Sequence, residues 1–442
     1  MRVLVLVDGE HYPPVTRWGM DVARERGFEP VLALLLGGTE KLGAGELPDL
    51  GVPVRRVSGS RARALADAID DSRPEGILDL SDEPIVGYRE RMELAAVALA
   101  RGVSYLGPDF RLDPPFDGPP IPAPTLAVIG TGKRTGKTAI SGAVARVAAE
   151  RGLDPVVVAM GRGGPADPQV AEAGSVTLET LFERVRRGEH AASDYLEVAV
   201  TSGVTTVGAR RAGGGLGGRP MATNVREAAE VAAGLGAGIV IVDGSGSAVP
   251  AMPWDAGILV VPATLPPEYL GGYLGPLRLL LSDLVVVTMA SSPAGLENIP
   301  TLRSHVERLH ADARLIVTDF VPRPLGDVRG RDVFFTTTAP EAVAERQVAL
   351  LERSHGCRVV GWSARLADRA GLTQDLEGAE DYDVLLTEIK AAAVDVASER
   401  AVAAGAQVIF TDNEVVAVDG PVDLAAAFAE AIGLATERRD HR

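Results

Sequence analysis

The sequence predicts an α/β protein built on parallel sheets, and two observations lead to this prediction. The first is the alternation of short apolar runs with helix-like segments along the chain. The second is a glycine-rich turn at residues 130–138, which joins an apolar run to a helix-like segment of small residues. Such alternation puts helices on both faces of a parallel sheet. The carboxyl ends of the strands then form the ligand-binding edge.

Residues 1–112 predict a Rossmann-like N-terminal domain. A polar loop, residues 8–14, follows the first expected strand, at the ligand-binding edge of the sheet. Glu10 and His11 in this loop are candidate contacts to a substrate or to a neighbouring subunit. We expect strands at 3–7, 30–36 and 76–80 and helices at 15–26, 61–71 and 89–100.

Residues 113–124 contain six prolines and predict a stiff linker, since proline disfavours helices and central strands. We expect a doubly wound nucleotide-binding domain at 125–290 and a C-terminal α/β extension at 291–442. The expected strands in these two parts are 156–159, 239–242, 258–261, 284–288, 315–319, 333–336, 359–361, 384–386 and 408–410.

Residues 130–138, Gly-Thr-Gly-Lys-Arg-Thr-Gly-Lys-Thr, predict a phosphate-binding loop. The glycines let successive backbone N–H groups point at phosphate oxygens, and the following helix adds its dipole. Lys137 is expected to reach the β- and γ-phosphates, and the Thr138 hydroxyl to bind Mg²⁺. Five residues separate Gly130 from Gly136, one more than in the common spacing. The expected nucleotide-binding residues here are Gly130, Gly132, Lys133, Arg134, Thr135, Gly136, Lys137, Thr138 and Ala139.

The use of lysine supports this site. The chain has 44 basic residues, but only Lys41, Lys133, Lys137 and Lys390 are lysines. Arginine cannot replace a compact ammonium point charge, so a retained lysine is a candidate functional residue. The alternative for Lys41 and Lys390 is that both are chance surface residues.

A second strand end is expected at the same edge. Residues 239–242 are apolar and run into Asp243-Gly244-Ser245-Gly246. In phosphate-loop proteins an acid at this place holds Mg²⁺, so Thr138 and Asp243 are the expected metal ligands. The Gly246 backbone can then approach a γ-phosphate.

Two glycine-rich segments carry arginines that suit phosphate and carboxylate oxygens. Arg162 follows a strand and is a candidate catalytic and phosphate-binding residue, unless its segment is a plain turn. Residues 205–220 contain Arg210, Arg211 and Arg219, and we expect a mobile lid that cannot pack in a core. The alternative is a linker without function.

Polar residues follow two strands nearer the C-terminus. Glu388 is a candidate substrate contact and Lys390 a candidate catalytic residue, while residues 411–414 are expected just after another strand. Helix capping by Thr387 or Asp412 is the alternative for these clusters.

The bulk composition excludes several classes. A net charge of −16 disfavours nucleic-acid binding, and the single cysteine, Cys357, excludes an internal disulfide framework. We find neither a signal peptide nor an apolar run of membrane-spanning length. The expected protein is therefore cytoplasmic and binds neither nucleic acid nor membrane. The negative charge does not exclude an anionic small-molecule substrate, because a local arginine cluster can bind one.

The phosphate loop and the run Asp243 to Pro250 resemble the dethiobiotin synthetase branch of P-loop proteins. That branch has a G-x5-G-K-T loop and an acidic-Gly-x-Gly strand end followed by proline. Here the acid is Asp243 where the branch usually has Glu. The signature lysine of related deviant loops is replaced by Gly132. This resemblance implies the fold and the use of a nucleotide.

A wider resemblance covers nearly the whole chain. The segments 7–15, 37–41, 130–138, 208–218 and 387–392 together resemble cyclic 2,3-diphosphoglycerate synthetase. The resemblance implies a ligase that uses ATP and Mg²⁺ to close 2,3-diphosphoglycerate into an intramolecular phosphoanhydride, which serves as a compatible solute. A homodimer is expected, and a requirement for K⁺ stays open. The implied substrate contacts are Glu10, His11, Arg162, Arg210, Arg211, Arg219 and Glu388.

Two alternatives remain at this point. One is another ATP-dependent ligase or kinase of the dethiobiotin synthetase type. The other is a P-loop nucleotide switch or metallochaperone. The sequence lacks the His/Cys cluster and the guanine-selective N-K-x-D motif that the latter would favour.

Overall fold

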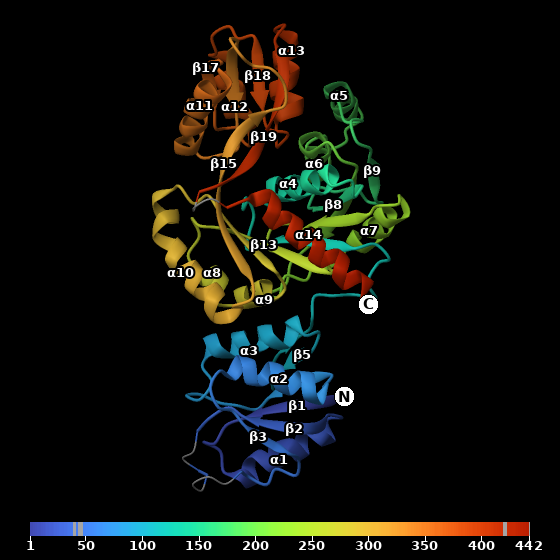
Figure 1. Cartoon of the computed structure of the whole chain (residues 1–442), viewed down its shortest axis with the longest axis vertical. Helices are drawn as coiled ribbons and strands as arrows, with labels where there is room; N and C mark the ends of the chain where they lie inside the picture. Colours follow the sequence, from blue (N-terminus) through green and yellow to red (C-terminus); the bar gives the residue numbers. More distant parts are fainter. Residues whose placement is uncertain (39–40, 43–46, 419–421, 442) are drawn as a thin grey trace.

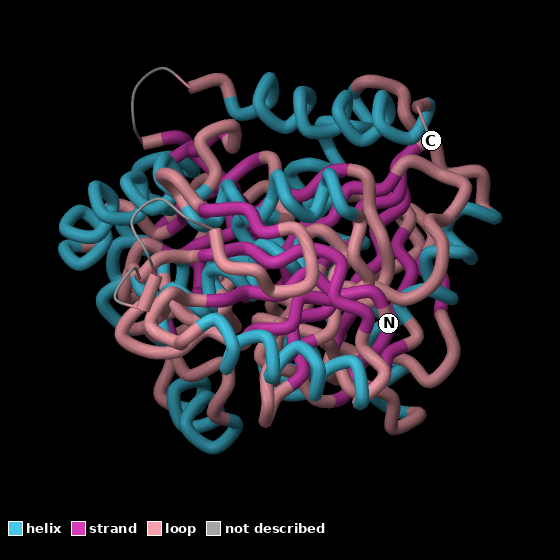
Figure 2. The backbone as a smooth tube through the Cα atoms, turned by 90° about the horizontal axis from the view of Figure 1, so that it is seen from below, coloured by secondary structure: helices cyan, strands magenta, loops and turns pink. Residues whose placement is uncertain are grey.

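The computed structural model describes residues 1–38, 41–42, 47–418 and 422–441. Three parts follow one another along its longest axis, with the N-terminal domain and a third lobe at opposite ends of the P-loop domain (Figure 1). Seen from below, strands run through the middle and helices lie around them (Figure 2). The predicted α/β class is confirmed. Within the described residues, no helix is long and apolar enough to cross a membrane.

The N-terminal domain is a Rossmann-like sheet of order β3-β2-β1-β4-β5-β6, with β6 antiparallel. Side chains of β1 alternate between two cores, as the pleat of a strand requires. Leu4 and Leu6 pack with α2 and α3, whereas Val5 packs with α1. The elements are β1 (Arg2–Val7), α1 (Pro13–Glu25), β2 (Glu29–Leu35), β3 (Val54–Arg56), α2 (Arg61–Ser72), β4 (Gly76–Asp79), α3 (Tyr88–Ala100), β5 (Ser104–Leu106) and β6 (Arg111–Leu112).

The P-loop domain contributes the strands β11-β10-β8-β12-β7-β13-β14-β15 to the second sheet. The strands are β7 (Thr125–Gly130), β8 (Pro155–Gly161), β9 (Gln169–Ala171), β10 (Thr206–Ala212), β11 (Ala222–Thr223), β12 (Ile239–Asp243), β13 (Ala256–Pro262), β14 (Leu284–Thr288) and β15 (Arg314–Pro324). The helices are α4 (Lys137–Glu150), α5 (Leu178–Arg186), α6 (Asp194–Ser202), α7 (Val225–Gly234), α8 (Glu268–Gly271), α9 (Gly275–Leu280) and α10 (Pro293–Leu309).

Apolar packing joins the N-terminal domain to the P-loop domain. Leu274 and Leu277, at the start of α9, are buried in the same cluster as Leu94 of α3. The core of the first domain is therefore completed by the second, which fixes the two domains against each other.

The third lobe continues the second sheet through β19-β18-β16-β17. Its elements are β16 (Asp332–Thr336), α11 (Glu341–His355), β17 (Arg358–Ser363), α12 (Arg369–Glu377), β18 (Val384–Thr387), the π-helix η1 (Ala393–Ser398), α13 (Glu399–Ala403) and β19 (Gln407–Ala417). The lobe is joined to the P-loop domain by an antiparallel ribbon, in which Thr318 of β15 pairs with Ala417 of β19. The chain then returns, and α14 (Leu424–Asp440) packs Phe428 into the core beneath the phosphate loop.

The structure corrects two local predictions. Residues 206–212 form β10, and Val207 and Ala209 are buried, so this part of the predicted lid packs in the core. Residues 411–414 do not follow a strand but lie within β19, because the strand bends from one pairing partner to the next. The predicted division at residue 290 stays a prediction; β14 before it and β15 after it pair in one sheet.

Candidate active site

The phosphate loop lies between β7 and α4, as the sequence predicts. Gly136 caps α4 with φ of 93°, a conformation that favours glycine. A Cβ at Gly136 would lie 2.2 Å from Cζ of Phe320 on β15, so the ribbon also requires a glycine here. The Thr135 carbonyl accepts a hydrogen bond from Thr288 at the end of β14 (2.8 Å). Two neighbouring strands thus hold the loop in place.

Lys137 is buried within this loop and is held by two short contacts. Its Nζ donates to the Gly132 carbonyl at 2.9 Å and lies 3.3 Å from Oγ1 of Thr135. Burial lowers the pKa of Lys137 to about 8, against the opposite effect of Asp243 and Asp194. An anionic phosphate at this place would stabilise the charged ammonium. Lys133 and Arg134 of the loop are exposed.

Asp243 ends β12, with its side chain buried beside the loop. Burial raises the pKa of its carboxyl to about 7, although Lys137 and the hydroxyls of Ser141 and Thr138 favour the ionised form. Asp243 Oδ1 and Ser141 Oγ are buried, and neither makes a hydrogen bond of good geometry with the described residues, although the Ser141 hydroxyl lies near enough to the carboxylate to favour its charged form. Orphaned buried polar atoms are costly, so this pair fits a ligand that the site is built to receive. Hard oxygen donors of this kind suit Mg²⁺.

Two of the predicted arginines meet at this site. A Cβ at Gly246 would lie 3.2 Å from one terminal nitrogen of Arg162 and 3.2 Å from one of Arg211. Arg211 also donates to the Ser245 carbonyl (2.9 Å). Both arginines oppose protonation of Lys137, which places their charge near its ammonium. Gly246 itself has φ of 61°.

The other two predicted arginines are not brought to this site. Arg210 and Arg211 are successive residues of β10, so their side chains leave opposite faces of the sheet. Arg219 binds the linker, through Asp117 (2.7 Å) and the Pro114 carbonyl (3.2 Å). Of these three arginines, Arg211 alone is brought to the site, and its binding of an anion stays a prediction.

Sequence reasoning missed two acids on α6. Asp194 is buried, and burial raises its pKa, while Lys137 and then Lys390 lower it. Glu197, three residues later, pairs with Lys390 (3.1 Å). Residues three apart share a face of a helix, so α6 presents one acid to each lysine. Both acids belong to an ordinary amphipathic helix with no motif, and only the fold reveals their neighbours.

Lys390 and Glu388 follow β18, and both reach the edge that faces the P-loop domain. Glu388 accepts hydrogen bonds from Oγ1 of Thr337 (3.0 Å), from the backbone N–H and Oγ1 of Thr338 (3.1 and 2.9 Å), and from Asn413 (3.3 Å). These donors and Lys390 lower the pKa of Glu388 despite its burial. Its oxygens are thus engaged by the protein, so the geometry favours a supporting role over the predicted substrate contact.

Glu10 and His11 lie in the N-terminal domain, which the P-loop domain separates from the third lobe (Figure 1). The Nδ1 of His11 lies 2.9 Å from Oδ1 of the buried Asp8. No contact recorded for the described residues joins them to the phosphate loop. Lys41 stacks over the Tyr12 ring (5.7 Å), while Thr39 and Glu40 of the predicted segment lie outside the described residues.

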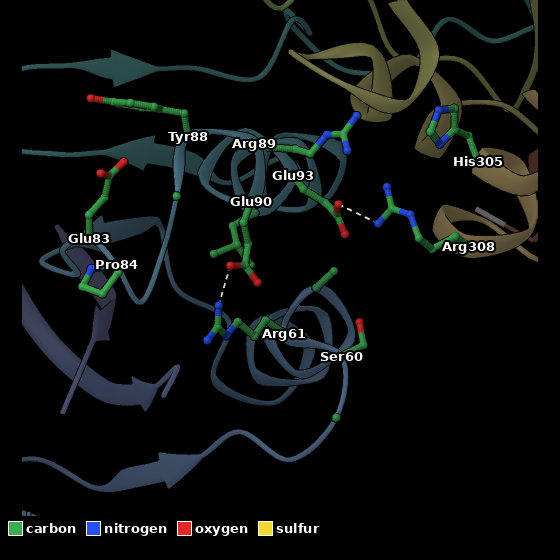
Figure 3. Close-up of a pocket in the computed structure, with 14 residues that line it drawn as sticks. Ser60, Arg61, Glu83, Pro84, Tyr88, Arg89, Glu90, Glu93, His305 and Arg308 are labelled. Carbon is green, nitrogen blue, oxygen red and sulfur yellow. Dashed lines mark hydrogen bonds and ion pairs between the residues drawn. The ribbon is translucent and has the colours of Figure 1, made fainter. Parts of the chain in front are cut away.

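A cavity of about 1090 Å³ lies between the N-terminal domain and α10 (Figure 3). None of the predicted site residues lines it. Its charges are largely neutralised within the protein. Arg61 pairs with Glu90, and Arg308 pairs across the domain boundary with Glu93 (2.8 Å). We therefore place the candidate active site at the phosphate loop and not in this cavity.

Comparison with known proteins identifies the family of the chain. Family models described as the N-terminal, P-loop and C-terminal domains of cyclic 2,3-diphosphoglycerate synthetase match residues 2–113, 125–319 and 324–414. The solved structure of the hydrogenase maturation factor HypB from Archaeoglobus fulgidus is also similar. It is 12% identical and covers 45% of this chain and 82% of its own, with a TM-score of 0.29. This last likeness is too weak to support an argument.

Two curated relatives extend over nearly the full chain. Cyclic 2,3-diphosphoglycerate synthetase of Rubrobacter xylanophilus is 48% identical over 94% of this chain and 95% of its own. The protein of the same name from Methanothermobacter thermautotrophicus is 41% identical over 95% of this chain and 93% of its own. The chain therefore belongs to the cyclic 2,3-diphosphoglycerate synthetase family of enzymes, as its sequence resemblance predicts.

Proposed function

We propose that this protein uses ATP to cyclise 2,3-diphosphoglycerate, giving the cyclic phosphoanhydride, ADP and phosphate. The observation that carries the proposal is the convergence on one edge of Lys137, Arg162, Arg211 and the orphaned carboxylate oxygen of Asp243. An edge with these charges suits a nucleotide triphosphate and a second, multiply anionic molecule.

The phosphate loop would hold the nucleotide. Backbone N–H groups of residues 131–138 cradle the phosphates, and the buried Lys137 reaches their terminal oxygens. Thr138 and Asp243 would hold Mg²⁺, which neutralises charge on the phosphate oxygens when it is bound. The unpartnered Oδ1 of Asp243 and Oγ of Ser141 support this assignment.

We infer a reaction in two displacements. An oxygen of one substrate phosphate attacks the γ-phosphorus of ATP, forming a P–O–P bond and releasing ADP. The second substrate phosphate then attacks the first, closes the ring and expels inorganic phosphate. Neither step needs a protein nucleophile, so Lys137, Arg162 and Arg211 act by orienting the reactants and neutralising charge.

The third lobe would exclude water from this chemistry. A phosphorylated intermediate is lost if water reaches it, and a covered site prevents this loss. Lys390 already reaches across to Glu197 on α6, so the lobe is in contact with the nucleotide edge.

The remaining expectations also stay proposals. We propose a cytoplasmic homodimer that acts on a small molecule and binds neither nucleic acid nor membrane. Light scattering of the purified protein tests the dimer, and assays in K⁺ against Na⁺ test a requirement for a monovalent cation.

Phosphorus NMR of the purified protein with ATP, Mg²⁺ and 2,3-diphosphoglycerate tests the central proposal. We expect new phosphoanhydride resonances that grow in step with ADP and free phosphate. ADP and phosphate without these resonances would mean an ATPase with another acceptor, and the proposed function would fail. Omission of 2,3-diphosphoglycerate is the control and should suppress ADP release.

A further inference from the structure

Lys390 is held at the junction of two lobes by a single close partner. Its Nζ lies 3.1 Å from Oε1 of Glu197 on α6 of the P-loop domain and 4.0 Å from Oε2 of Glu388 in its own lobe. The Glu197 side chain is 11% exposed and that of Lys390 is 34% exposed. The Lys390 side chain is therefore partly open to solvent, whereas that of Glu197 is largely covered.

The two acids beside Lys390 differ in what else they bind. Glu388 is engaged by Thr337, Thr338 and Asn413 and remains in place whatever Lys390 does. Among the described residues, the Glu197 side chain has one ion-pair partner, Lys390. Glu197 is thus the exchangeable partner, and Glu388 is the fixed one.

The backbone presents Lys390 in an unusual way. The next residue, Ala391, has φ of 49°, a left-handed conformation that costs free energy for a residue with a side chain. The π-helix η1 begins two residues later, at Ala393, and its Val394 packs with Leu181 of α5 and Tyr195 of α6. Strained backbone and π-helices cost free energy and persist only where the surrounding structure holds them in place. Both are found frequently at functional sites.

Lys390 also lies close to the nucleotide edge. Asp194 stands one helical turn from Glu197 on α6, and the charges of both Lys137 and Lys390 lower its pKa. A Cβ at Gly161, the residue before Arg162, would lie 3.0 Å from Oδ2 of Asp194. An anion bound to Lys390 would therefore lie on the side of α6 that carries Asp194 to the P-loop edge. Arg162 and Arg211 mark the P-loop side of the same space.

We propose that Lys390 forms the subsite for an anionic group of the substrate, and that the carboxylate of Glu197 occupies this subsite until the substrate displaces it. The inference rests on the proposed function, since it assigns one end of 2,3-diphosphoglycerate to the third lobe. Glu197 acts here as an internal stand-in for a phosphate or carboxylate oxygen.

The exchange is physically reasonable because a phosphate offers Lys390 more charge than a carboxylate. The released Glu197 stays largely buried among Lys390, Asp194 and Glu388. Burial raises the pKa of Glu197 and the Lys390 ammonium lowers it, so the carboxylate takes up a proton more readily once the ammonium turns to the substrate. Proton uptake limits the cost of leaving it without a cation.

Calorimetric titration of 2,3-diphosphoglycerate into the ADP-bound protein tests the exchange. In Glu197→Gln the competing charge is gone, so we expect the dissociation constant to fall about fivefold, with ADP affinity unchanged. Lys390→Met should weaken binding at least about tenfold. The matched control is Glu377→Gln, which removes an exposed ion pair with Arg400 inside the third lobe and should leave the constant unchanged.

Two outcomes would overturn the inference. Unchanged or weaker substrate binding in Glu197→Gln would mean that Glu197 only orients Lys390. A double-mutant cycle of thermal unfolding on Glu197→Gln and Lys390→Met that shows no coupling would mean that the pair does not form in the free protein. By contrast, a wild type that binds 2,3-diphosphoglycerate but forms no cyclic product overturns the proposed function alone.

Discussion

The two sheets differ in the hydrogen bonding of the carboxylates at the carboxyl ends of their parallel strands. In the N-terminal domain, Asp8 accepts hydrogen bonds from the backbone N–H groups of Glu10, His11 and Asp82 and contacts the His11 ring. Asp79 likewise engages Ser81 and Tyr105. In the P-loop domain, Asp243 keeps a buried oxygen without any partner among the described residues.

The difference indicates which edge is built for a ligand. A carboxylate whose oxygens all accept hydrogen bonds stabilises the fold without a ligand. A buried carboxylate oxygen without a partner destabilises the free protein, and a bound cation would remove that cost. The cavity beside the N-terminal domain repeats the first pattern, since Arg61 and Arg308 are both paired there. The active chemistry is therefore expected at the P-loop edge, with the N-terminal domain as support.

The largest effect should come from removing the buried lysine of the P-loop edge. Lys137→Ala should lower kcat at least about a thousandfold, because it removes the buried ammonium that is placed to neutralise charge on the terminal phosphates. Steady-state ADP release measures the loss, and circular dichroism confirms that the variant folds. Near-normal turnover would refute the phosphate-loop assignment.

A pair of neighbouring arginines gives an intermediate effect with its own control. Arg211 meets Arg162 at Gly246, whereas Arg210 leaves the opposite face of β10. Arg211→Ala should raise the KM for 2,3-diphosphoglycerate about tenfold or more, and Arg210→Ala should change it less than about twofold. Equal effects of the two substitutions would contradict the face assignment.

The smallest effect is expected at the satisfied edge. His11→Ala removes a contact between Asp8 and an imidazole ring that is 38% exposed. We therefore expect the free energy of unfolding to fall by less than about 1 kcal/mol. The kcat/KM should change less than about twofold. Thermal unfolding and ADP release provide the two readouts. A large loss of activity at unchanged stability would contradict this expectation and would support the substrate contact that the sequence context of His11 predicts.

The sequence alone determined the fold class and the position of the phosphate loop between a strand and a helix. The glycine spacing of 130–138 and the apolar run before Asp243 are local patterns, and local backbone preferences decide both. The family resemblance was carried by the same kind of evidence, since short segments stand in fixed order along the chain. Lysine scarcity directed attention to Lys390, although it could not identify its partner.

Only the tertiary structure decided which charges meet. Arg210 and Arg211 are equivalent in sequence, but the pleat of β10 separates their side chains. Glycine content suggested a lid at 205–220, but pairing with β8 and burial of Val207 made half of it a core strand. Glu197 and Lys390 are far apart in the chain, and no local pattern encodes their contact. Long-range packing brings such residues together, so the electrostatics of the site follow from the fold and not from composition.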